Sequence, residues 1–131
     1  MCVNAAITGL TIKTLPELIE RINMWNTKRA PWNLINFSFM TAMTPPQMVP
    51  DIFGSGVFDE DFKRILAAMP AVEEKDKSAR EHMMGIIQQI EAGPRNPKMI
   101  EELKVYLTEM DRRRDTDWRT LFPWLDQDWI A

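Results

Sequence analysis

The fold follows from residues 3–39, "VNAAITGLTIKTLPELIERINMWNTKRAPWNLINFSF". Residues 3–12 carry no charge and are rich in Val, Ile and Thr, a composition that predicts a buried strand. Residues 34–39, LINFSF, alternate between β-branched or aromatic side chains and polar ones, which predicts a second strand.

Between these two strands, apolar residues recur at helical spacing. Thr14 and Glu17 form a T-x-x-E capping box that predicts a helix start, and the helix should run to about Trp25. Its apolar side consists of Leu15, Leu18, Ile19 and Ile22. A strand, a helix and a strand in succession are the pattern of a parallel crossover unit.

A parallel sheet of two strands is incomplete by itself, because parallel sheets usually contain more strands and are covered on both faces. We therefore expect an exposed strand edge that pairs with a second copy of the chain or with another protein.

Residues 41–61 are predicted to be irregular, because prolines and glycines interrupt the segment throughout. Loops of this length are often functional. Methionine side chains suit adaptable binding surfaces, although they also fill irregular cores. Met43, Met48 and Phe53 are therefore candidate residues of an interaction surface.

The following residues predict helices. Asp59 is placed to cap a helix that ends before Pro70. A longer helix should span about residues 73–92, with its apolar side on Met83, Ile86, Ile87 and Ile90, and end at Gly93.

Asn96 and Pro97 suit the cap and the first position of a further helix, which we expect to pair with the preceding one as an antiparallel hairpin. Thr116 is placed to cap a short last helix that stops near Pro123. The fold class is thus α+β, predominantly helical, with an N-terminal β-α-β unit followed by three or four helices. At 131 residues, we expect one domain over residues 1–131.

Composition narrows the function classes. A net charge of -3 and a pI near 5.2 disfavour nucleic acid as a partner. The single cysteine, Cys2, excludes a disulfide within the monomer and any cysteine-built metal site, and it fits a reducing, cytoplasmic setting. The start does not resemble a signal peptide, and no apolar run is long enough for a membrane span, so we expect no membrane partner.

No residue pattern indicates catalysis or a cofactor. His82 is the only histidine and lies beside the apolar side of its helix, where a surface or boundary position is favoured over a general base or metal ligand. The acidic run at 59–61 suits a helix start, whose dipole favours negative charge, better than a metal site. We expect no catalytic residue, no metal ligand and no cofactor.

Two groups near the C-terminus are candidate interaction residues. Arg112, Arg113 and Arg114 suit the C-terminal end of a helix, or alternatively a clamp for a phosphate or carboxylate. Trp118 and Trp124 could form a recognition surface, although packing of the tail against the core is favoured because an exposed tryptophan is costly.

The order of the motifs resembles the C-terminal part of radical SAM proteins of the twitch-domain type, found in phage and environmental genomes. The resemblance rests on residues 3–23, on INFSF with the proline-rich stretch 44–54, and on "EMDRRRDTDWRTLFPWL" at 109–125. The positions that match the family's motifs are Asn4, Leu15 to Glu17, Asp111, Arg114, Trp118 and Phe122 to Leu125.

The resemblance implies that the chain is the C-terminal part of a larger partial α/β barrel, with further strands before Met1. The family's chemistry depends on a CxxxCxxC motif that holds an iron-sulfur cluster and SAM, and the sequence has only Cys2. We therefore carry over neither the activity nor the cofactors. The sequence predicts a non-catalytic interaction module. The alternative is a fragment of a radical SAM enzyme that contributes to a substrate pocket and is inactive alone.

Overall fold

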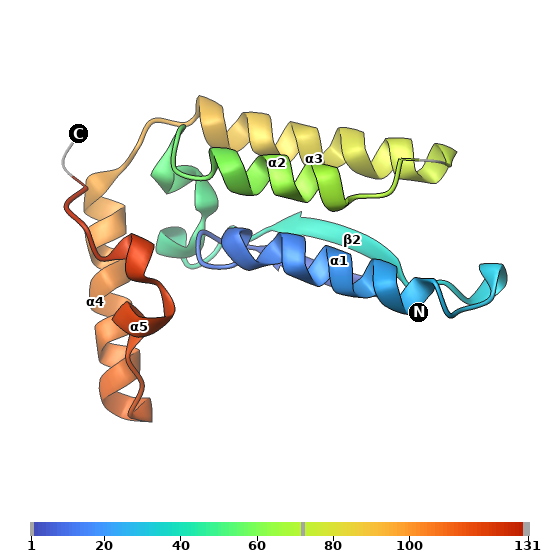
Figure 1. Ribbon diagram of the computed structural model, residues 1–131. Coiled ribbons are helices and arrows are strands. Elements are labelled where there is room, and N and C mark those ends of the chain that lie inside the picture. Colours follow the sequence, from blue (N-terminus) through green and yellow to red (C-terminus); the bar gives the residue numbers. More distant parts are fainter. Residues whose placement is uncertain (1, 72, 130–131) are drawn as a thin grey trace.

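The computed structural model describes residues 2–71 and 73–129, with the backbone alone at Phe37. Strand β1 (Cys2–Ile7), helix α1 (Leu15–Asn26) and strand β2 (Asn36–Thr41) follow one another, and the two strands are parallel. The expected β-α-β unit is present, and helices make up most of the remaining α+β fold (Figure 1).

Strand β1 is shorter than predicted, because the chain turns away after Ile7. The hydroxyl of Thr11 accepts a hydrogen bond from the N–H of Thr8 at 2.9 Å and donates one to the carbonyl of Ala6 at 3.2 Å. A short 3-10 turn, Ile12–Thr14, then leads into α1. The prediction of a strand up to residue 12 is therefore wrong, since the two threonines form a turn instead.

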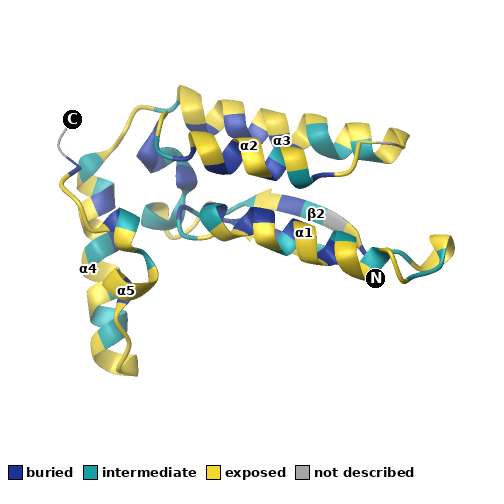
Figure 2. Ribbon diagram, in the orientation of Figure 1, coloured by how far each residue is buried: buried dark blue, intermediate teal, exposed yellow. Residues whose placement is uncertain are grey.

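The sheet has one buried and one exposed face. Ala5, Ile7 and Phe39 share the buried face, where the Cα atoms of Ala5 and Phe39 are partners in the register. On the opposite face, Asn4 and Met40 are exposed. Figure 2 shows both buried and exposed residues along β2. The helices that cover the sheet therefore lie on its buried face.

Helix α1 buries Leu15, Ile19 and Ile22 and packs along α2 (Asp59–Ala68). The predicted capping box at its start is absent, because Thr14 has helical backbone angles and its side chain makes no capping hydrogen bond. The 3-10 turn before α1 continues directly into the helix, so the first backbone groups need no side-chain cap.

Helix α2 begins one residue earlier than a cap at Asp59 would require. The N–H of Phe62 donates to the carbonyl of Phe58 at 2.8 Å, so Phe58 is the N-cap residue and Asp59 lies in the first turn. A capping box does occur at the start of α3 (Glu74–Ala92), where Glu73 and Asp76 each accept a backbone N–H. The sequence does not predict this box, because its N-cap residue is a glutamate, which is not a preferred cap.

Helix α4 (Pro97–Arg114) starts at the predicted cap, with the side chain of Asn96 accepting the N–H of Met99 at 3.1 Å. It runs at a steep angle to α3, so the predicted antiparallel hairpin is wrong (Figure 1). The connection between the helices is tied instead to a 3-10 turn, η4 (Pro50–Phe53), because the N–H of Asn96 donates to the carbonyl of Ile52 at 2.8 Å.

The last helix, α5 (Trp118–Leu121), is capped by Asp117, which accepts the N–H of Arg119 at 3.1 Å. Thr116 is not the cap, since its hydroxyl donates to Asp111 at 2.6 Å. The predicted stop near Pro123 is confirmed, since α5 ends at Leu121.

The buried side chains form one contiguous hydrophobic cluster that reaches from the sheet to the C-terminal tail. Phe53, Phe58 and Trp118 are among its largest fully buried members. Within residues 2–71 and 73–129, none of the helices has the length and apolar character needed to cross a bilayer.

Candidate functional site

The outer edge of β1 is the first candidate. In a parallel ladder, the N–H and C=O groups of one residue point to the same edge of the strand, and those of the next residue point to the other edge. The N–H of Ala42 donates to the carbonyl of Ile7 at 2.9 Å, which assigns the odd-numbered residues of β1 to the bonds with β2. Cys2, Asn4 and Ala6 therefore direct their N–H and C=O groups away from β2.

This edge is open. Cys2, Asn4 and Ala6 are all exposed, and the carbonyl of Ala6 accepts the Thr11 hydroxyl. Within the described part of the chain, no other hydrogen bond reaches the backbone groups that these three residues turn outward. Natural edge strands are usually protected by a charged residue or a proline, and residues 2–7 contain neither.

The outer edge of β2 differs, because α3 lies against it. A ring nitrogen of His82 on α3, Nε2, lies 3.1 Å from the carbonyl oxygen of Phe39, which points away from β1. His82 itself is exposed, in line with the predicted surface position. The side of the sheet that remains open is therefore that of β1.

The interaction residues predicted from the sequence do not form one surface. Met43 is exposed, Met48 is half-buried against the core, and the side chain of Phe53 is completely buried. Trp118 is buried and Trp124 half-buried. The favoured interpretation of a packed tail is confirmed for Trp118, and neither Phe53 nor Trp118 has a side chain available to a partner.

The arginine run follows the predicted helix end. Arg112 and Arg113 hydrogen-bond to Glu109 at 2.6 and 3.0 Å, whereas Arg114 is exposed at the last position of α4. The hydrogen bonds from Arg112 and then Arg113 lower the pKa of Glu109, and the pKa of Arg112 is raised in return. Because Glu109 already engages two of the three guanidinium groups, a phosphate clamp here would have to displace it.

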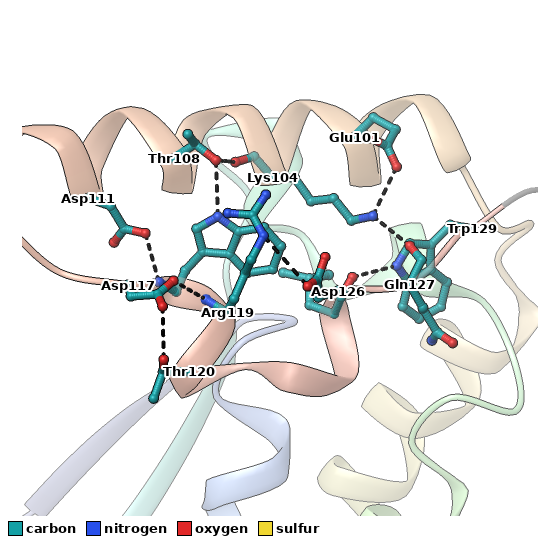
Figure 3. A network of polar contacts seen from close by, with 12 residues as sticks. Glu101, Lys104, Thr108, Asp111, Asp117, Arg119, Thr120, Asp126, Gln127 and Trp129 are labelled. Carbon is teal, nitrogen blue, oxygen red and sulfur yellow. Dashed lines mark hydrogen bonds and ion pairs between the residues drawn. The ribbon is translucent and has the colours of Figure 1, made fainter.

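The C-terminal tail, residues 115–129, is held to α4 by polar contacts (Figure 3). The indole Nε1 of Trp118 donates to the hydroxyl of Thr108 at 3.0 Å, and its backbone N–H donates to Asp111 at 2.7 Å. Further along, Lys104 donates to the carbonyl of Gln127 at 2.6 Å. These contacts give the tryptophan tail a structural role.

The tail also covers an aromatic cluster. The rings of Phe53, Phe58 and Trp124 meet edge to face, with centroids 5.4 to 5.5 Å apart. Lys13 lies 5.3 Å from the centroid of the Trp124 ring and forms an ion pair with the buried Asp61 at 2.9 Å. Lys13 and Asp61 neutralise each other, so the pair contributes to packing and neither side chain is a free reactive group.

A groove of about 780 Å³ lies between the end of α1, the start of β2 and the start of α3. Its asparagines are already engaged: Asn26 exchanges hydrogen bonds with the backbone of Ile35, and Asn23 donates to the carbonyl of Ala68 at 2.7 Å. The two asparagines therefore serve to hold the chain together around the groove. No group of His, Cys, Asp and Glu residues that could hold a metal ion occurs among the residues described.

Comparison with protein-family models, curated proteins and solved structures gives no match for this chain. The resemblance to radical SAM proteins is not tested by these comparisons and stays a prediction.

The sequence predicted an open strand edge but not its residues. The uncharged run from residue 2 to residue 12 was the available signal. Assigning Asn4 and Ala6 to the outer edge required the register with β2, and identifying β1 as the open strand required the position of α3.

Proposed function

We propose that this chain is a non-catalytic interaction module that accepts an additional β-strand along the outer edge of β1. The observation that carries the proposal is the set of exposed, uncharged residues Cys2, Asn4 and Ala6, whose outward backbone groups lack a strand partner within the described residues. Strand addition uses such groups for affinity, and the alternating side chains beside them for specificity.

The physical basis is hydrogen bonding. Each backbone hydrogen bond contributes a net free energy of about 0.5–1.5 kcal/mol, so a short edge supports a modest, reversible association unless further contacts form. The occupant is a protein strand, from a second copy or from another chain, and a chain of net charge -3 suits nucleic acid poorly. We place this module in the cytoplasm, where an exposed lone cysteine stays reduced.

The test is a pair of substitutions at one position. Asn4→Pro removes an outward N–H but none of the bonds with β2, so the fold should survive at this edge. Asn4→Ala keeps the N–H and changes only the side chain. Circular dichroism first shows that both variants are folded. Sedimentation then measures the self-association of each variant. The amount of any other protein that binds to the chain is compared between the two variants.

Association that is retained in Asn4→Ala and lost in Asn4→Pro supports the proposal, whether the partner is a second copy or another protein. If every association persists equally in Asn4→Pro, or if the wild-type chain shows no binding that depends on this edge, the proposal is wrong.

A further inference from the structure

We propose that the strand accepted by β1 is β1 of a second copy, running antiparallel and centred on Asn4. This inference rests on the proposed function and specifies its partner and register. It predicts one continuous sheet in the order β2, β1, β1, β2.

The available backbone groups match in this register. Asn4 lies opposite Asn4 of the second copy, and each N–H donates to the other carbonyl. Cys2 lies opposite Ala6 of the second copy, and these two residues also form a hydrogen-bonded pair. The Ala6 carbonyl has two lone pairs, so it can accept this bond in addition to the Thr11 hydroxyl.

The turn after β1 excludes the neighbouring registers. A shift that centred the pairing on Ala6 would place Thr8 opposite Asn4 of the second copy. The N–H of Thr8 is already bound by the Thr11 hydroxyl at 2.9 Å, so it has no proton to offer. A shift toward Cys2 would place Ala6 opposite no residue of the part of the second copy that the structure describes. Centring on Asn4 is the register that uses the open edge of both copies.

A second copy also fits the chemistry of this edge. Cys2, Asn4 and Ala6 are uncharged, so two identical edges meet without like-charge repulsion. Cys2 and Ala6 lie two residues before and two residues after Asn4. A second copy that runs in the opposite direction therefore places its Ala6 opposite Cys2 and its Cys2 opposite Ala6. One two-fold axis through this point closes the assembly as a dimer.

Disulfide trapping tests the register. In a hydrogen-bonded antiparallel pair, Cα atoms lie about 5.5 Å apart, within the range that a disulfide bridges. In the Ala6→Cys variant, Cys2 should therefore form a disulfide with the introduced cysteine of the other copy when oxidised glutathione is added. Non-reducing electrophoresis and peptide mass spectrometry detect the covalent dimer and identify the bridge.

Two controls share the same exposed sheet face. In the wild type, Cys2 of one copy and Cys2 of the other lie four residues out of register, too far apart for a disulfide. In Met40→Cys, the new cysteine lies on β2, one strand further from the interface. Ala6→Cys should cross-link roughly tenfold faster than either control, because only its cysteines come within bonding range.

Rapid cross-linking of the Ala6→Cys variant through Cys2, with slow cross-linking in both controls, supports the inference. Equal rates in the wild type, or a monomeric wild type at all concentrations, overturn it. If Asn4→Pro abolishes association but Ala6→Cys does not cross-link, this register is wrong while the proposed function still holds.

Discussion

At the scale of single residues, Gly9 shows how closely the turn after β1 packs. A Cβ atom at this position would overlap the ring of Phe53, which is completely buried. We expect Gly9→Ala to lower the free energy of unfolding by about 1–3 kcal/mol, because an overpacked core must distort to make room. Urea denaturation followed by circular dichroism measures the change.

Gly85 is the matched control, since it lies inside α3 with open space around its Cα. Gly85→Ala should raise the free energy of unfolding by about 0.5–1 kcal/mol, because alanine loses less backbone entropy in a helix. If the two variants changed stability equally, the close packing of Gly9 against Phe53 would be disproved.

Trp118 provides a second prediction at the residue scale. Its side chain is 1 % exposed and hydrogen-bonded to Thr108, so Trp118→Ala should lower the free energy of unfolding by about 3–5 kcal/mol. Trp124 is half-buried, and Trp124→Ala should cost less. Thermal melts would contradict the packed tail if both variants kept the wild-type melting temperature.

At the scale of elements, the sequence predicted most helices because the signals are local. Asn96 caps α4 through its own backbone neighbourhood, and Gly93 directly follows α3, as expected. The angle between these helices could not be predicted in this way. It depends on the contact of Asn96 with Ile52, more than forty residues earlier in the chain.

Helix α4 supplies a prediction for pH dependence. Arg112 and Arg113 hydrogen-bond to the Glu109 side chain and lower the pKa of Glu109 in the folded state. A carboxylate with a lowered pKa stabilises the fold above its unfolded pKa, and this contribution disappears as the pH falls through the folded value. We therefore expect wild type to melt above Glu109→Gln at pH 7, and the difference to vanish well below the usual carboxylate pKa of about 4.3.

Glu102→Gln is the control for this experiment, because Glu102 lies exposed on the same helix and forms no ion pair with the residues that the structure describes. Its melting temperature relative to wild type should change little with pH. A difference for Glu109→Gln that persisted at pH 2.5 would show that the side chain acts through its shape and not its charge.

At the scale of the whole molecule, charge is unevenly distributed. Of the 19 acidic residues, only Glu17 and Glu20 precede Asp51. The β-α-β unit is therefore almost free of negative charge, and the excess of acidic over basic residues lies in residues 51–131. The sequence alone reveals this asymmetry, but which strand edge stays open depends on where the later helices pack.

This distribution predicts how salt affects association through β1. The edge itself is uncharged, so the electrostatic term between two copies is the repulsion of molecules with a net charge of -3. The Debye length falls from about 30 Å at 0.01 M salt to about 8 Å at 0.15 M, which screens this repulsion. Sedimentation equilibrium should therefore show tighter association at the higher salt concentration, and Asn4→Pro should stay monomeric at both. Weaker association at the higher concentration would mean that ion pairs between the copies hold them together, and the uncharged edge of β1 would no longer account for the contact.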